Sequence, residues 1–345
     1  MSAYNDLSLE EEIKKIIAGS PAIQSSTKAY GKSWMLTCGG VLNIYGNTAP
    51  EELEALHPAD VTQIQFARRF EMRDATLHAL DTSILSANPD ARLRDVFNGH
   101  GCFDDLRFLK KLPHLAALGF TAFHQVDLSP IVAYTQLKEL GLGGHNLSLS
   151  PLVGYETLES LWFGDKVKDY ASIGKIPNLK QLVIGSQKLK SLAFLEDLSK
   201  LEKLSFSFGG TTYFEDLPAL STLVELELWR TRMLEADQLE PINRMSRLTT
   251  LSLRELPRIK TLNWLHSATL NKLLLEGMKG LNTYDSLGNL PQLDTLIIKD
   301  VIDQQKLQSL ESLDNVTTIF LYKHYLDAHK EYLAGSPLKE KILPL

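Results

Sequence analysis

The sequence predicts an α/β repeat fold, a solenoid in which each unit supplies one short parallel strand and one compact helical return. Two observations predict it. The pattern Leu-x-x-Leu-x-Leu, with other apolar residues at some positions, occurs eleven times between Leu93 and Leu321, and successive copies start 21 to 25 residues apart. Between the copies, apolar residues recur at every third position. Self-similarity at a fixed period is the signature of stacked repeats, because one unit cannot bury its apolar face alone.

The strand motif predicts which side chains face the core. Side chains alternate along a strand, so we expect the fourth and sixth positions, together with the first, to point inward. The third, fifth, seventh and eighth positions then face the open side of the sheet or its edges. The first copy, Leu93-Val96-Asn98, is the poorest. The copies begin at Leu93, Leu115, Leu137, Leu158, Leu179, Leu201, Leu223, Leu248, Leu270, Leu293 and Val316.

The segments between the strand motifs predict 3₁₀ turns. A period of three fits neither a strand, which repeats every two residues, nor an α-helix, which repeats every 3.6 residues. It suits short 3₁₀ turns, in which residues i and i+3 eclipse. One such run is Leu189, Leu192, Leu195, Leu198 and Leu201.

These units resemble leucine-rich repeats of the short class, about 22 residues long, found in bacterial internalins and in small phosphatase regulators. The segments VDLSPIVAYTQL and LSLSPLVGYETL are similar to the internalin return segment, and the resemblance covers about two thirds of the chain, from Leu93 to Leu326. It implies a leucine-rich-repeat solenoid with a curved parallel β-sheet on the concave side and 3₁₀ or short helices on the convex side. The ninth position departs from the family, which carries Asn or Cys there. This sequence has Gly101, Phe123, His145, Lys166, Gln187, Gly209, Thr231, Leu256, Met278, Val301 and His324.

The ends of a solenoid expose its core and require caps. We expect an N-terminal cap over residues 1–92, an array of about eleven repeats over 93–325 and a C-terminal cap over 326–345. In the N-terminal cap, LSLEEEIKKIIAG predicts a helix that stops at Gly19. The apolar segments SWMLT and VLNIY flank Gly39-Gly40, which predicts a hairpin with a two-residue turn.

The remaining cap segments are shorter. APEELEAL predicts a helix that starts near Pro50, and YLDAHKEYLAG predicts an amphipathic helix that ends at Gly335. The triplet Val61-Ile64-Phe66 has the spacing of a degenerate first repeat. The interval from Val61 to Leu93 does not match the period, so we expect residues 60–92 to be irregular.

Composition and charge exclude several classes of protein. The chain has 345 residues, 44% of them hydrophobic and 23% charged, which is an ordinary soluble balance, and it contains no apolar run long enough to cross a membrane. The polar, acidic start is not a secretory signal, and Cys38 and Cys102 form neither a disulfide framework nor a zinc spacing. The net charge of −6 disfavours general nucleic-acid binding. We therefore expect a cytoplasmic monomer without cofactor or metal that binds neither nucleic acid nor membrane.

Catalytic motifs are absent from the sequence, and one constellation remains. Cys102, His124 and Asn146 each occupy the tenth position of consecutive units, and a Cys–His pair supported by an amide is a known nucleophile arrangement. We favour the alternative that they are ordinary turn residues, because the register of these loops is uncertain. His100, His114, His124 and His145 lie in the same units, but no metal-ligand spacing links them. We therefore expect no enzyme activity.

The open face of the sheet carries the binding hypothesis. In the first half of the array this face is small and glycine-rich, broken by Trp162 and Phe208. From Glu227 onward it is bulky and charged, with Arg232, Glu255 and Asp300 among its residues, and Trp beside Arg is the composition of an interface hot spot. The alternative is a solvated face with cross-strand ion pairs such as Arg254 with Glu276. The predicted partner-binding residues are Trp162, Asp165, Phe208, Glu227, Trp229, Arg230, Arg254, Glu276, Lys299 and Tyr322.

The predicted function is a non-enzymatic protein–protein interaction scaffold that binds a protein partner on its concave face, for example as an intracellular inhibitor or immunity-type neutraliser. Three alternatives stay open. The first is an exported, internalin-like host-interaction factor. The second is an enzyme whose repeats recognise the substrate, and the third is a spacer.

Overall fold

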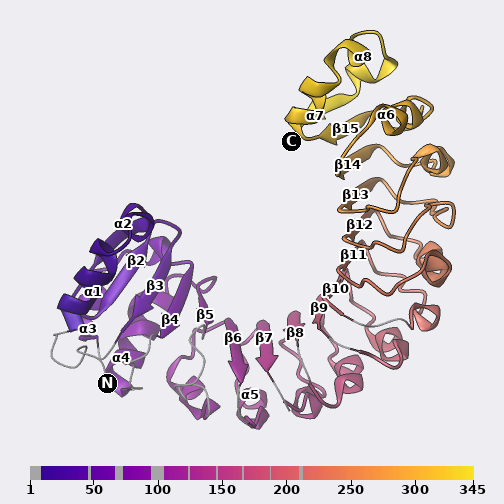
Figure 1. Ribbon diagram of the computed structural model, residues 1–345. Coiled ribbons are helices and arrows are strands. Elements are labelled where there is room, and N and C mark those ends of the chain that lie inside the picture. Colours follow the sequence, from indigo (N-terminus) through magenta and orange to yellow (C-terminus); the bar gives the residue numbers. More distant parts are fainter. Residues whose placement is uncertain are drawn as a thin grey trace, which may run out of the picture. The chain divides into compact units, whose positions relative to one another are not determined.

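Short strands alternate with compact helical returns along most of the chain. The computed structural model describes residues 9–45, 48–66, 73–94, 105–122, 125–144, 147–164, 167–186, 188–209 and 213–345. The chain divides into two compact units, Met1–Tyr170 and Ala171–Leu345. Figure 1 shows the strands and helices of both.

The first unit begins with antiparallel strands and continues as a parallel sheet. β1 pairs with β2 and β2 with β3 in antiparallel fashion, and from β3 to β8 each strand pairs in parallel with the next. Parallel pairing thus starts within the segment that the sequence assigns to the N-terminal cap. The strands are β1 (Thr27–Tyr30), β2 (Trp34–Thr37), β3 (Val41–Ile44), β4 (Gln63–Phe66), β5 (Arg92–Arg94), β6 (Ala117–Ala122), β7 (Glu139–Gly144) and β8 (Ser160–Phe163).

The predicted hairpin is confirmed, because Trp34 pairs with Ile44 and Leu36 with Leu42. Its connection holds three residues, 38–40, where the sequence predicts two. Gly40 closes it with φ of +80°, a left-handed conformation that favours glycine. The predicted helices before and after this hairpin are also present. The helical elements of this unit are α1 (Leu9–Ala18), α2 (Pro21–Ser26), α3 (Pro50–Glu54), η1 (Pro58–Asp60), α4 (Asp74–Ala79), η2 (Leu80–Leu85), η3 (Leu106–Lys111), α5 (Ser129–Val132) and η4 (Ser150–Leu152).

The structure differs from the sequence-based expectation over residues 60–94. The described part of this interval is regular, with β4, α4 and the π-helical turn η2, so the predicted irregular segment is wrong there. Leu93 pairs with Leu118 on one side and Ile64 on the other, so it occupies the fourth position of its unit and not the first. The period does not predict this register, because Ile64 and Leu93 lie 29 positions apart (93 − 64), whereas later repeats are 21 to 25 residues long. Val96 and Asn98 lie outside the described residues.

The second unit is parallel throughout. Strands β9 to β16 pair in chain order, and equivalent positions meet: Leu204 pairs with Leu226, and Leu226 with Leu251. Leucines at the first, fourth and sixth positions are buried, as predicted. The strands are β9 (Gln181–Gly185), β10 (Lys203–Ser207), β11 (Glu225–Trp229), β12 (Thr250–Arg254), β13 (Lys272–Glu276), β14 (Thr295–Lys299), β15 (Thr318–Leu321) and β16 (Ile342–Pro344).

The returns of the second unit are mostly 3₁₀ helices, which confirms the meaning of the three-residue period. In Figure 1 they lie on the side of the strands opposite to the open sheet face. This face, formed by the third, fifth and seventh positions of β9–β16 with the eighth positions at its edge, is called the open face below. The helical elements are η5 (Tyr170–Lys175), η6 (Ala193–Asp197), η7 (Phe214–Asp216), η8 (Ala236–Arg244), η9 (Asp285–Asn289), α6 (Gln304–Glu311), α7 (Lys323–Ala328), α8 (Lys330–Ala334) and η10 (Pro337–Glu340).

The C-terminal segment is more elaborate than the single helix that the sequence predicts. Two short helices, α7 and α8, meet at His329, whose imidazole lies 3.0 Å from the carbonyl oxygen of Ile302. The carboxylate of Glu311 accepts hydrogen bonds of 2.6 Å from the hydroxyls of Tyr332 and Ser336. The chain then adds β16 alongside β15. This cap therefore extends the sheet as well as covering the core.

Left-handed residues end successive strands of the second unit. Ser186, Phe208, Arg230, Glu255 and Gly277, each at the eighth position, have φ between 52° and 64°. In the first four, the backbone N–H donates to the carbonyl of the seventh residue of the next strand over 2.7 to 2.9 Å. A left-handed conformation costs about 1–2 kcal/mol in a residue other than glycine, so the added hydrogen bond offsets part of that cost.

The ninth position, for which the sequence lacks the expected Asn, is buried in three consecutive repeats of the second unit, whereas Val301 in the next repeat is 68% exposed. Leu256 and Met278 are fully buried there, and Thr231 is buried with no hydrogen-bond partner for its hydroxyl. The turns are therefore held by backbone hydrogen bonds and by the core. The ninth-position residues Gly101, Phe123, His145, Lys166 and Gln187 lie outside the described residues.

The inward assignment of the fourth position predicts a cavity effect. Leu204→Ala should lower the free energy of unfolding by about 2–5 kcal/mol, because Leu204 is 2% exposed and its neighbours cannot fully close the space. Denaturant unfolding measures this. The control is Lys203→Ala, an exposed neighbour on the same strand, whose effect should stay within about 0.5 kcal/mol. Equal effects of the two substitutions would contradict the assignment.

The left-handed turns predict a contrast between two glycines. Gly277→Ala should destabilise the protein by about 1–2 kcal/mol, because φ is +64° and a new Cβ would lie 2.9 Å from Cγ of Glu255. Gly288→Ala should be neutral or slightly stabilising, since its nearest neighbour would be 3.8 Å away. Thermal unfolding of both variants tests this. If the Gly277→Ala variant were as stable as the wild type, the left-handed conformation at this turn would not be required, which would contradict the prediction.

Candidate protein-interaction site

Side chains of the open face line up in rows across the strands. In-register pairing places Trp229 beside Ser207 on one side and beside Arg254 on the other, and Arg254 beside Glu276. Neighbouring strands lie about 4.8 Å apart, so long side chains in a row reach one another. The sequence therefore determines which charges and rings become neighbours, once the register is set.

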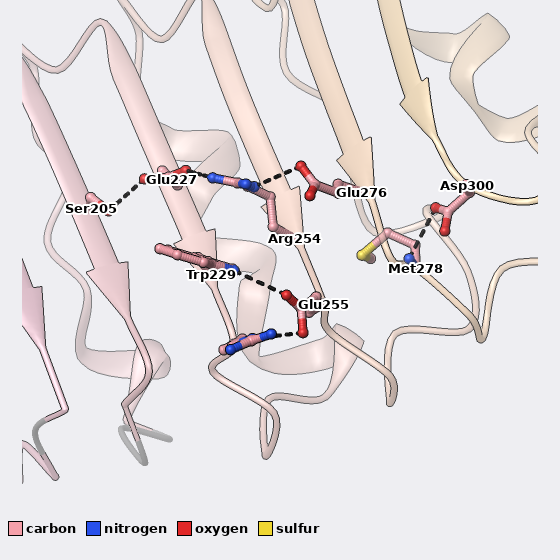
Figure 2. A network of polar contacts seen from close by, with 9 residues as sticks. Ser205, Glu227, Trp229, Arg254, Glu255, Glu276, Met278 and Asp300 are labelled. Atoms are coloured by element: carbon pink, nitrogen blue, oxygen red, sulfur yellow. Dashed lines mark hydrogen bonds and ion pairs between the residues drawn. The ribbon is translucent and has the colours of Figure 1, made fainter. Parts of the chain in front are cut away.

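Arg254 lies at the centre of an ion-pair network. Its guanidinium donates to Glu227 through Nη1 and to Glu276 through Nε, each over 3.0 Å (Figure 2). The hydroxyl of Ser205 donates to the other oxygen of Glu227 over 2.8 Å. Burial opposes the charge of Arg254, but hydrogen bonds to Glu276 and Glu227 outweigh it and raise its pKa. The predicted Arg254–Glu276 pair is thus present, with Glu227 as a second acceptor.

Trp229 is held from several sides. The guanidinium carbon of Arg254 lies 4.7 Å from the centroid of the indole ring, within cation–π distance. The ring of Phe208 lies 4.3 Å away, tilted by 57°. The indole N–H donates to Glu255 over 3.3 Å (Figure 2). These contacts fix the orientation of a large ring on a face that remains accessible to solvent.

Glu255 links the aromatic and ionic parts of the face. It accepts a 2.6 Å hydrogen bond from Nε of Arg230, whose guanidinium also lies 5.2 Å from the Phe208 ring centroid. Arg232 approaches the same carboxylate at 3.8 Å. The left-handed turns at Arg230 and Glu255 bring these side chains together. The Trp229 cluster is defined as Phe208, Glu227, Trp229, Arg230, Arg254, Glu255 and Glu276.

The sequence pattern predicts that Glu255 lies on the charged face, but Glu255 is not among the predicted partner-binding residues. Glu255 is the eighth residue of its repeat, and the sequence pattern does not predict that a left-handed turn there directs the carboxylate toward Trp229 and Arg230. The only sequence signal was the neighbouring pair Arg254-Glu255 one repeat after Trp229-Arg230.

Two predicted site residues of the second unit lie apart from the cluster, a third belongs to the first unit, and a fourth cannot be placed. Trp162 is 41% exposed on β8 of the first unit. Lys299 lies on β14, two strands beyond Arg254, and Tyr322 follows β15, where its ring stacks 5.5 Å from the imidazole of His324. Asp165 lies outside the described residues.

Asp300 forms a hydrogen bond with the backbone at the edge of the charged face. Its carboxylate accepts a 3.0 Å hydrogen bond from the backbone N–H of Met278 (Figure 2). Burial raises the pKa of Asp300, against the opposing effect of that hydrogen bond. Asp300 therefore supports a turn and is not a free charge on the open face.

The candidate catalytic and metal residues are mostly outside the described part of the chain: Cys102, His124, Asn146, His100 and His145 cannot be placed. His114 can, and it pairs with the buried Asp81 through its ring nitrogen at 2.8 Å and its backbone N–H at 2.9 Å. Among the described residues, no group of three His, Cys, Asp or Glu side chains could hold a metal ion. Nor does any described helix have the length and apolarity needed to cross a membrane.

By sequence, the chain matches no family model and no curated protein. By structure, it is similar to an internalin, InlF, of Listeria monocytogenes, with a TM-score of 0.52, 20% identity, and coverage of 92% of this chain and 89% of that one. A circular leucine-rich-repeat protein, CroV588, has a TM-score of 0.49 at 17% identity, covering 84% of this chain and 41% of that one. In the Toll–Spätzle complex of Drosophila, the matched chain has a TM-score of 0.47 at 16% identity, covering 92% of this chain and 56% of that one. The fold comparison rests on the internalin, and the fold is a leucine-rich-repeat solenoid.

The environment of Glu255 predicts a pH response. The hydrogen bond from Arg230 lowers the pKa of the Glu255 carboxyl, and the hydrogen bond from Trp229 lowers it further. Desolvation raises the pKa, but by less, so the net shift is downward. A lowered folded-state pKa contributes stability above the unfolded value, about 4.3, which is lost as the pH falls through the folded value. In ¹H–¹⁵N spectra, the Trp229 indole signal should therefore titrate with a midpoint below about 4.3.

Two comparisons make this titration specific. The Trp162 indole, which is exposed on the first unit, provides an internal reference. Glu255→Gln should remove the transition from the Trp229 signal. A transition that persists in this variant, or a midpoint above the ordinary glutamate value, would contradict the assigned hydrogen bonds.

Proposed function

We propose that the protein is a non-enzymatic scaffold that binds a protein partner on the open face of the second unit, centred on the Trp229 cluster. The observation that carries the proposal is that the rings of Trp229 and Phe208 are fixed by neighbouring side chains and yet remain accessible to solvent. Both rings lie on a face where side chains are held by several mutual contacts, and Phe208 is still 44% exposed. Tryptophan and arginine in such a setting are the residues that dominate binding energy in protein interfaces.

Preorganisation supports this role. Trp229 touches Phe208, Arg254 and Glu255, so it loses little rotamer freedom when a partner covers it. Ordering a free side chain at an interface costs about 0.5–1.5 kcal/mol, and a prefixed cluster avoids much of that cost. The alternation of Glu227, Arg254 and Glu276 favours a partner with both signs of charge in a matching order.

The finer role that we propose is that of a cytoplasmic binder that covers a surface of its partner, as an inhibitor or a neutraliser does. A rigid face built from successive strands suits the masking of a folded surface. This role requires no catalytic group, and the protein acts in it as a monomer.

A double substitution tests the proposal. Trp229→Ala with Arg230→Glu removes the central ring and reverses the charge beside it, so capture of the partner in a pull-down from lysate should be lost. For the purified partner, loss of one hot spot of about 2 kcal/mol corresponds to an affinity reduced about 30-fold. The matched control is Met233→Ala with Lys260→Glu, which makes the same kinds of change at exposed residues outside the strands.

The outcomes separate clearly. Capture of one protein by the wild type and by the control, but not by the Trp229/Arg230 variant, supports the open face as the binding surface. Equal capture by all three proteins would place the binding surface elsewhere. Cooperative thermal unfolding of the double variant, with at most a small decrease in stability from the lost surface contacts, excludes misfolding, since both side chains project outward from the core.

A further inference from the structure

The last strands of the second unit carry a second, chemically different surface. At the fifth position, where earlier strands have Ser205, Glu227 and Ser252, β13 to β16 carry apolar residues that are adjacent in the pairing register. The first three are half-buried, and Leu343 is 47% exposed. This set, called the Leu274 row, consists of Leu274, Ile297, Phe320 and Leu343.

Positive charge flanks the Leu274 row. Lys272 lies at the third position of β13 and Lys299 at the seventh position of β14, so both share the open face with the row. Among the ion pairs of the described residues, none joins Lys272 or Lys299 to a carboxylate. On the open face, Lys299 lies beside Glu276 in the pairing register, and the Glu276 carboxylate is bonded to Arg254. An acidic ligand would therefore find two ammonium groups that form no ion pair beside an apolar strip.

The spacing of the row indicates the backbone that fits it. Neighbouring strands are about 4.8 Å apart, so the row offers one apolar residue about every 4.8 Å across the strands. An α-helix presents one residue per turn on a given face, at about 5.4 Å. An extended segment presents a side chain on one face about every 6.7 Å. Its side chains therefore lose their match with the spacing of the row, about 4.8 Å, after about two strands. The four strands span about 14 Å, or about ten helical residues.

We propose that the Leu274 row docks an amphipathic helix of about ten residues from a protein partner. The helix lies across β13–β16, with its apolar stripe on the row and acidic side chains opposite Lys272 and Lys299. This inference rests on the proposed use of the open face, and it assigns a different part of that face from the Trp229 cluster. It names the kind of ligand by its chemistry: an acidic amphipathic helix.

Selection from a phage-displayed library of random 16-residue peptides tests the proposal, because such peptides can bind as helices or as extended chains. Wild-type protein is the target, and binders that also recognise Ile297→Glu are removed. Enriched sequences should place apolar residues at i, i+3 or i+4, and i+7, with Asp or Glu on the flanks. Alternation of apolar residues at i and i+2, or basic flanks, would overturn the proposal, as would no enrichment over the Ile297→Glu target.

Individual peptides then give a quantitative test by fluorescence anisotropy. Lys272→Glu with Lys299→Glu should weaken a selected acidic peptide on the order of tenfold, whereas Lys260→Glu should leave its affinity unchanged. Leu343→Glu provides a second row variant at a more exposed site, in case Ile297→Glu disturbs the sheet. Because the peptides are selected against Ile297→Glu, Leu343→Glu is the independent test, and equal affinity for wild type and Leu343→Glu would contradict the proposal.

Two further arms separate the alternatives. The Trp229→Ala/Arg230→Glu variant should still enrich acidic helical peptides, so failure of the Trp229 cluster as a site leaves this test intact. Sedimentation of the protein alone identifies a second copy as the occupant. A concentration-dependent dimer that Ile297→Glu abolishes would show that the row is a self-association surface, and would overturn the assignment of a partner helix.

Discussion

Parallel pairing of equivalent positions is the constraint on which the second unit depends. Because Leu204 pairs with Leu226 and Leu226 with Leu251, every inward side chain meets another inward side chain, and the core continues from repeat to repeat. The same register arranges the outward residues in rows. A slip of one residue would exchange the two faces of a strand, so burial of the leucines also determines the order of charges and rings on the open face.

The strand ends connect stability to the candidate site. Phe208, Arg230 and Glu255 adopt a left-handed conformation that is unfavourable for residues with a side chain, whereas Gly277 adopts it readily. Those three residues also make the contacts that hold Trp229. Backbone strain of this kind is typical of functional sites, where the surrounding structure holds the strained residues in place. The backbone hydrogen bonds to the next strand and the packed ninth-position residues stabilise these turns.

Much of the fold could be predicted from periodicity. Each motif copy from Leu115 onward coincides with a strand, because the positions of buried leucines follow directly from the pleat. The unit around Leu93 could not be placed in register, since its longer return breaks the period. For the candidate site, the pattern predicted that Trp229 and Arg230 share a face with the Arg254–Glu276 pair, and the structure shows that pair. The pattern could not identify Glu255 as the link between them, because its position follows from backbone conformation and not from spacing.

The open face combines a rigid aromatic and ionic cluster with an apolar row flanked by lysines, and Ser252 lies between them, paired with Glu227 and Leu274. The most direct measurement is photo-crosslinking from this position. A photoreactive amino acid at residue 252 should crosslink one specific protein in the native cell, and the same group at Met233, which is exposed outside the strands, should not. Crosslinks from residue 233 with none from residue 252 would contradict the claim that the open face binds the partner.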